Sequence, residues 1–89
     1  MKSSITKDFR KRFERLPKDV QRRAKRAFQR WQHDPFHPSL HFKRVSKTHP
    51  IYSVRIGSDY RALGLIKNGT IIWFWIGSHN EYDNLLRSL

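Results

Sequence analysis

The strongest constraint on the fold is the apolar run Ile-Ile-Trp-Phe-Trp-Ile at residues 71–76. An uninterrupted apolar run of this length is typical of a strand that is buried on both faces. Asn68-Gly69 comes just before it and is a strong signal for a two-residue hairpin turn, because both turn positions need a positive φ. We therefore expect a strand at residues 70–76, joined by that turn to the strand before it.

The first third of the chain shows a helical period instead. Pro17 is compatible with the first turn of a helix but would end a helix that precedes it, and Asp34-Pro35 is a stop signal. We expect two helices, at about residues 5–15 and 17–33, joined tightly as a hairpin. Their apolar residues recur at spacings of three and four: Ile5, Phe9, Phe13, Leu16, Val20, Ala24, Ala27, Phe28 and Trp31.

After a loop at residues 34–41 the apolar period changes to about two, which indicates strands. Helices first and an antiparallel meander second predict an α+β fold. We expect an N-terminal helical hairpin on one face of a four-stranded antiparallel sheet, with the other face free. Residues 79–88 are expected to form a short C-terminal helix, with Asp83 or Asn80 near its start, or an extended tail. The predicted strands are 42–45, 51–56, 60–67 and 70–76.

The size of the chain, 89 residues, predicts a single domain over residues 1–89. The sequence has no Cys, which excludes disulfides and thiolate metal sites. No apolar run approaches the roughly 20 residues of a membrane span, so we expect no membrane association. The absence of a targeting signal fits a cytoplasmic protein.

Charge is the most prominent global property. The chain has 19 Lys and Arg against 7 Asp and Glu, a net charge of +12. Such a field attracts polyanions, either nucleic acid, an acidic protein or an anionic membrane surface, although it could also be only a solvated surface. Eleven of the 19 basic residues lie between Lys7 and Arg30. The residues of the second helix that we expect to contact RNA are Arg22, Arg23, Arg26 and Arg30.

Strand alternation predicts a basic cluster on the sheet. Ser53 and Arg55 share one face of their strand, and Arg61 follows on the next strand. Lys43 and Arg44 point to opposite faces, so one of them can join the two arginines. The alternative is that these residues are the ordinary polar side of a one-sided sheet.

The apolar strand delivers His79 and Tyr82 to the edge of this basic face. Histidine can act as acid or base near neutral pH, because its unperturbed pKa is about 6.5. Arginine suits a phosphate, and tyrosine can donate a proton or stack on a base. Together they would make a metal-free ribonuclease, with a base for the 2′-hydroxyl, cations for the phosphorane and an acid for the leaving oxygen. Alternatively, His79 is a surface or helix-capping residue.

Metal binding and cofactors are not expected. His33, His37 and His41 have the spacing of neighbours on a helix, but Pro35 and Pro38 exclude a helix there. No acidic cluster accompanies them to supply further ligands for zinc. The sequence also lacks a glycine-rich phosphate loop and a serine nucleophile elbow.

Three motifs resemble a known family. They are Tyr-Ser-Val-Arg-Ile at 52–56, Asp-Tyr-Arg at 59–61, and Gly-Ser-His at 77–79 followed by Tyr82. With the helical hairpin, they are similar to the RelE/ParE superfamily of toxins from bacterial type II toxin–antitoxin modules, over nearly the whole chain. The resemblance implies one of two activities. RelE-like members cleave messenger RNA on the ribosome without metal, and ParE-like members inhibit DNA gyrase and have no nuclease site.

The resemblance also implies roles for individual residues. His79 matches the terminal histidine of one subgroup, whereas Tyr82 falls three residues later than in members where the two are adjacent. Only a stub at 2–4 remains of a first strand. We therefore expect a ribosome-dependent endoribonuclease with a cognate acidic antitoxin, and as alternatives a gyrase inhibitor or a basic RNA-binding module. The basic residues that match are Arg55, Arg61, Lys43 and Arg44.

Overall fold

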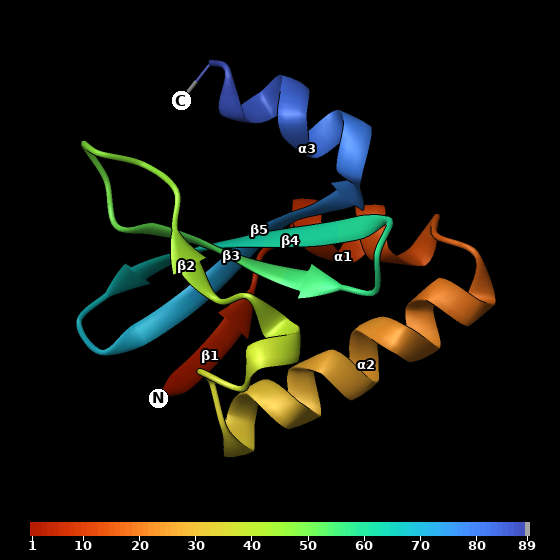
Figure 1. Ribbon diagram of the computed structural model, residues 1–89, viewed down its shortest axis with the longest axis horizontal. Coiled ribbons are helices and arrows are strands. Elements are labelled where there is room, and N and C mark those ends of the chain that lie inside the picture. The colour runs from red at the N-terminus through yellow and green to blue at the C-terminus, as the bar shows by residue number, and fades with distance from the viewer. Residues whose placement is uncertain (89) are drawn as a thin grey trace.

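The computed structural model describes residues 1–88, and Leu89, the last residue of the expected domain, lies outside the described residues. The two predicted helices are confirmed to within about two residues at each end. No helix in residues 1–88 has the length and apolar character needed to cross a membrane. In chain order the elements are β1 (Lys2–Ile5), α1 (Lys7–Glu14), α2 (Lys18–His33), the 3₁₀ turn η1 (Pro38–Leu40), β2 (Lys43–Arg44), β3 (Ile51–Ile56), β4 (Tyr60–Lys67), β5 (Thr70–Ser78) and α3 (His79–Leu86) (Figure 1).

The sheet has five strands in the order β1-β5-β4-β3-β2. Strands β2 to β5 form the predicted antiparallel meander, but β1 runs parallel to β5, with Lys2 opposite Thr70 and Ile5 opposite Trp73. The prediction of a four-stranded, purely antiparallel sheet, with the helical hairpin at the N-terminus, is therefore wrong in this respect. The reason is that the four residues of β1 are all exposed and show no alternation, while their partner lies at the far end of the sequence.

The predicted hairpin between β4 and β5 is confirmed. Asn68 has a φ of 52° and Gly69 a φ of 75°, as the two central positions of such a turn require. The turn between β3 and β4 also uses a left-handed residue, Gly57, with a φ of 66°.

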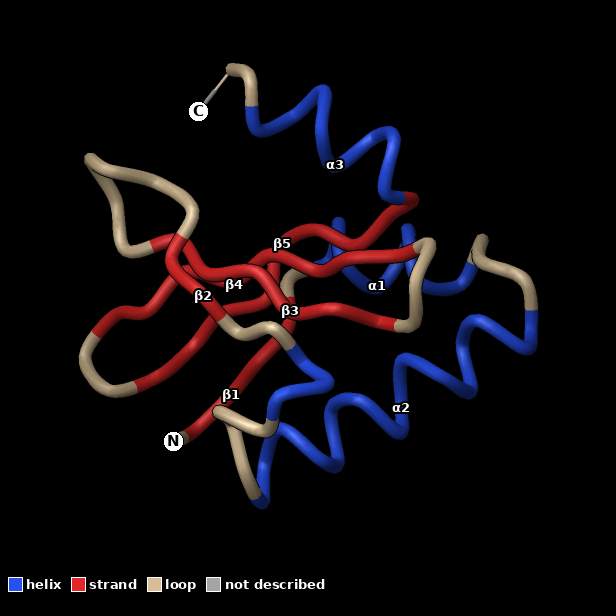
Figure 2. Tube along the Cα trace, viewed as in Figure 1, coloured by secondary structure: helices blue, strands red, loops and turns tan. Residues whose placement is uncertain are grey.

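Helices α1 and α2 cover one face of the sheet (Figure 2). Trp31 of α2 and Trp73 of β5 meet edge to face, with ring centroids 5.5 Å apart and an interplanar angle of 79°. Such pairs add specific packing to the burial of two large apolar side chains. The buried residues of this first core are Phe9, Ala24, Trp31, Leu40, Val54, Ile56, Ala62, Ile71, Trp73 and Ile76.

The opposite face is not free, contrary to expectation. Helix α3 lies over it, on the other side of the sheet from α2 (Figure 1). The register between β4 and β5 shifts at Leu63/Gly64, and the consecutive residues Phe74 and Trp75 both join the core beneath α3. This shift is a β-bulge, which places one extra residue in one strand. The buried residues of this second core are Ile51, Leu63, Trp75 and Tyr82.

The short C-terminal helix expected within residues 79–88 is confirmed as α3, and the alternative of an extended tail is not. Its N-cap is Ser78, whose hydroxyl accepts from the Glu81 amide at 3.2 Å, while the Glu81 carboxylate accepts from the Ser78 amide at 3.1 Å. This is a complete capping box. Asn80 lies in the first turn, near the start of the helix as expected, whereas Asp83 lies in the second turn and the capping residue Ser78 was not anticipated.

Candidate active site

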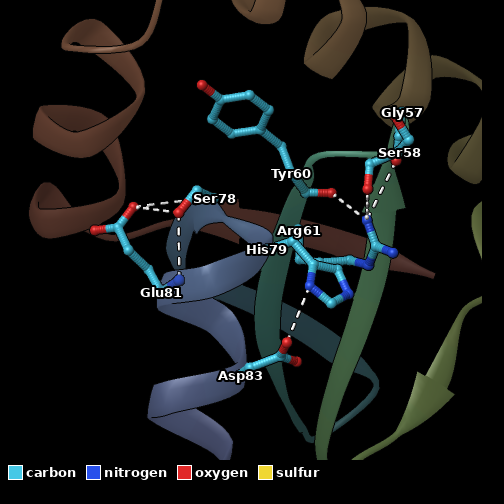
Figure 3. Close-up of polar contacts among 8 residues, drawn as sticks. All are labelled: Gly57, Ser58, Tyr60, Arg61, Ser78, His79, Glu81 and Asp83. Atoms are coloured by element: carbon cyan, nitrogen blue, oxygen red, sulfur yellow. Dashed lines mark hydrogen bonds and ion pairs between the residues drawn. The ribbon is translucent and has the colours of Figure 1, made fainter.

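Two arginines meet at the turn between β3 and β4. Arg55 and Arg61 are direct partners across the strands, so they lie on the same face of the sheet. Nε of Arg55 donates to the Gly57 carbonyl at 3.1 Å. Nη1 of Arg61 is close to three carbonyls, those of Gly57 at 3.2 Å, Ser58 at 3.3 Å and Tyr60 at 2.8 Å (Figure 3). The carbonyl dipoles of the turn thus hold two like charges together.

Arg61 is a cation with free donors. Burial lowers its pKa, the neighbouring Arg55 charge lowers it further, and Tyr82, Asp83 and Asp59 act in the opposite direction. A guanidinium nonetheless stays protonated in a protein. Within residues 1–88, its Nε and Nη2 make no hydrogen bond. These groups are available to an oxyanion.

His79 is placed beside this pair by the start of α3. Its amide donates to the Asp59 carbonyl at 2.7 Å, which ties the end of β5 to the turn that carries the arginines. Its Nδ1 lies 3.0 Å from Oδ2 of Asp83, one helical turn later, and its side chain is 44% exposed. Figure 3 shows the imidazole on the same side of β4 as the Arg61 side chain. A carboxylate on Nδ1 favours the tautomer that leaves the Nε2 lone pair free to take a proton.

Gly77 allows the close packing at this point, a role that the sequence did not reveal. It lies opposite Arg61 in the sheet. A Cβ built on Gly77 would lie 2.7 Å from Cζ2 of Trp75 and 3.2 Å from Oε1 of Glu81. The ring of Trp75 therefore occupies the space that any larger residue would need.

Tyr82 does not reach the surface of the site. It is 5% exposed, and its hydroxyl donates to Oγ of Ser53, itself 2% exposed, at 3.1 Å. Its ring packs against those of Trp75 and His79, with centroids 6.5 Å and 5.9 Å away. The predicted role as a proton donor to RNA requires an accessible phenol, so the burial is at odds with it. Tyr82 instead packs against the His79 ring from within the core beneath α3.

The family match extends over most of this structure. Residues 18–84 match the model of the ParE-like toxin domain, which is more than half of the chain. The chain belongs to the ParE-like toxin family. No curated protein matches it at a significant level.

Solved structures of toxins share the fold of this ParE-like chain. RelE in the antitoxin–toxin complex from Methanococcus jannaschii is 21% identical, with a TM-score of 0.72 over 91% of this chain and 95% of that one. YafQ from E. coli is 8% identical, with a TM-score of 0.72 over 90% and 94%. The isolated E. coli RelE toxin is 13% identical, with a TM-score of 0.67 over 99% and 98%. At such identities the likeness shows the fold alone.

The structure decides which basic residue of β2 joins the arginine pair of the ParE-like chain. Lys43 pairs with Ser53 and so shares the face of Arg55. Arg44 pairs with Tyr52 and lies on the face that α1 and α2 cover. Nε of Arg44 donates to the Ser46 carbonyl at 2.9 Å. Only Lys43 therefore extends the basic cluster.

Of the four arginines of α2 that were expected to contact RNA, three line one cavity and the fourth does not. Arg23, Arg26 and Arg30 line a cavity together with Arg55, while Arg22 is exposed and outside it. The sequence could place all four on one basic helix but could not show which of them face the sheet.

The histidines at 33, 37 and 41 do not converge. His33 ends α2, His37 accepts from the Ser39 amide at 3.2 Å, and His41 has a left-handed φ of 44°. Within residues 1–88 no three His, Asp or Glu side chains come close enough together to hold a metal ion.

Proposed function

We propose that this ParE-like chain is the toxin of a toxin–antitoxin module and cleaves messenger RNA on the ribosome without a metal ion. One observation carries the proposal: the imidazole of His79, in contact with Asp83, lies on the same side of β4 as Arg61, whose cross-strand partner is Arg55 (Figure 3). A base and two cations at one place are what cleavage of a phosphodiester needs.

The reaction follows from these positions. Nε2 of His79 takes the proton of the ribose 2′-hydroxyl, and the 2′-oxygen attacks the phosphorus. The bond from phosphorus to the 5′-oxygen breaks, and that oxygen takes a proton from water, since Tyr82 is buried. Arg55 and the free donors of Arg61 stabilise the charge that grows on the phosphorane oxygens. The products are a 2′,3′-cyclic phosphate and a 5′-hydroxyl.

The partners follow from charge and from the relatives. RelE from Methanococcus jannaschii was solved with its antitoxin RelB, and a net charge of +12 on this chain suits an acidic antitoxin. An antitoxin bound over Arg55 and Arg61 would keep RNA from reaching these two side chains. Such a toxin would act in the cytoplasm, where ribosomes translate messenger RNA.

The test is cleavage of messenger RNA by the purified full-length chain, with translating ribosomes, between about pH 6 and 8. We expect His79→Gln and Arg61→Ala each to lower the rate by about 10²-fold or more. Arg61→Lys keeps the charge and loses the planar fork, so its loss should be intermediate. His49→Gln is the matched control, because His49 is exposed in the loop before β3, at the end of the sheet opposite to the candidate site.

Intact message with the wild-type chain at every pH would refute the nuclease. Equal losses in His79→Gln and His49→Gln would show that the effect of the first substitution is not local to the site.

A second candidate is inhibition of DNA gyrase without catalysis, which the match to the ParE-like toxin domain favours. In that case the pair of His79 and Asp83 is only an i, i+4 contact that supports α3. The His79→Gln variant would then keep full toxicity, with supercoiling defects in place of truncated message.

A further inference from the structure

The arginines of the candidate active site continue around the β3–β4 turn to helix α2. The Gly57 carbonyl accepts from both Arg55 and Arg61. The other side of Gly57 faces α2, because a Cβ built there would lie 3.5 Å from Nη1 of Arg23. Figure 1 shows α2 passing below this turn. One glycine thus stands between the active-site arginines and a second group of arginines.

The second group surrounds a cavity of about 350 Å³ between α2, η1 and the turn. We call it the arginine pocket. Cavities that hold small ligands begin at about 300 Å³, so the arginine pocket has room for a phosphate with part of its sugar. Its polar lining comes from Arg23, Arg26, Arg30, Arg55 and Ser39.

The arginine pocket carries an excess of positive charge. Arg23 is paired with Asp19, at 2.7 Å between Nη2 and Oδ2. Within residues 1–88, Arg26, Arg30 and Arg55 have no carboxylate partner. Like charges gathered around a concave surface repel one another, and an anion in the cavity would relieve that repulsion.

A neutral side chain holds one of these guanidinium groups in position. Nη1 of Arg30 donates to Oγ of Ser39 at 3.1 Å. The Ser39 hydroxyl lies 2.8 Å from Nδ1 of His37, which also accepts from the Ser39 amide. The hydroxyl is thus fixed among the guanidinium groups.

We propose that the arginine pocket binds a phosphodiester of the RNA strand that is cleaved, close in sequence to the scissile bond, with Arg55 shared between the two sites. The planar guanidinium fork suits the paired oxygens of a phosphate. RNA is favoured over an acidic protein segment because Arg55 lines the pocket and is also the cross-strand partner of Arg61, so a strand held at the candidate active site would run past the pocket. Phosphate contacts set the register of a strand without reading its bases. The inference rests on the proposed function, because it takes RNA as the ligand.

The test is binding of a fluorescent RNA hexamer with 2′-O-methyl riboses, which lacks the attacking hydroxyl and stays intact. Affinity of the full-length chain is measured by anisotropy at several salt concentrations. We expect Arg26→Gln and Arg30→Gln each to weaken binding about tenfold. The double variant should reduce the slope of log affinity against log salt by about 1.4, or 0.7 per lost contact.

The matched control is Lys25→Gln, which removes one positive charge from an exposed position of the same helix outside the pocket. It should weaken binding by less than about threefold, as a distant screened charge does. Arg26→Lys and Arg30→Lys, which keep the charge, should lose less than the glutamine variants. Each variant should have the melting temperature of the wild type, because the substituted residues are exposed. An unchanged melting temperature would show that the fold is intact.

Three results would overturn the inference. Equal effects of Lys25→Gln and Arg26→Gln would mean that only overall charge attracts RNA. Competition by a polyglutamate peptide, at the affinity of the hexamer, would assign the pocket to an acidic protein.

Cleavage separates the two proposals. If His79→Gln loses cleavage but hexamer binding does not depend on Arg26 or Arg30, the pocket alone is refuted. Pocket-dependent binding by a wild-type chain that cuts no message refutes the nuclease alone.

Discussion

Replacing Tyr82 with Phe would remove one oxygen atom from the core beneath α3. That oxygen is the partner of the Ser53 hydroxyl, at 3.1 Å, and both residues are almost fully buried. A buried polar group left without its partner costs about 1–3 kcal/mol. For a domain of this size, each kcal/mol lowers the melting temperature by about 4–8 °C. The expected change in Tyr82→Phe is therefore a clear loss of stability.

Urea unfolding of a double-mutant cycle measures that loss. Ser53→Ala leaves the phenol without its acceptor and should cost a similar amount. The combination of Tyr82→Phe and Ser53→Ala removes both partners and should cost less than the sum of the two single changes, by about 0.5–1.5 kcal/mol. Strict additivity would show that the hydrogen bond contributes nothing.

The same variant decides whether Tyr82 takes part in catalysis. Cleavage by Tyr82→Phe, measured well below its melting temperature, should stay within a few fold of the wild-type rate. A proton donor in the reaction would instead be worth about 10²-fold or more. A loss of that size in a fully folded variant would refute the structural role argued from its burial.

Two further predictions concern stability. Gly64→Ala should destabilise by about 1–3 kcal/mol, because the new Cβ would lie 2.7 Å from Cγ1 of Ile71 and 2.8 Å from Cε3 of Trp73; an unchanged urea midpoint would contradict this. Hydrogen bonds from the amide and hydroxyl of Ser78 lower the pKa of Glu81 below its usual 4.5, so the carboxylate stabilises the fold above that pH and loses its contribution as the pH falls through the lower folded pKa. The stability difference between wild type and Glu81→Gln should therefore shrink from about pH 6 to pH 3, and a constant difference would exclude the capping carboxylate as its source.

Much of the fold was predictable because its signals are local. The stripe from Phe9 to Trp31 has the period of a helix, and the turn at Asn68-Gly69 allows few other conformations. The strand β1 gave no such signal, because four exposed residues become a strand only through a partner at the other end of the chain. The β-bulge in β5 was equally hidden within an unbroken apolar run.

The candidate site was predictable in part for a related reason. Alternation along two strands brought Arg55 and Arg61 to one face, and the end of the apolar run placed His79 nearby. The same reasoning could not see that Tyr82, three residues along α3, turns inward to Ser53, since that depends on which side of the helix meets the sheet. It also gave Asp83 only as a residue near the start of a helix, and not as the partner of His79.

The parallel pairing of β1 with β5 bears on how the chain is made. Synthesis proceeds from the N-terminus, and contacts between distant segments form only when both exist. Residues 2–5 leave the ribosome long before residues 70–73, which they must join. The apolar faces of α1 and α2 also pack against β5, and His79 follows β5 in the sequence. A nascent chain therefore cannot complete its five-stranded sheet before residues 70–78 have been made, and His79 follows them directly.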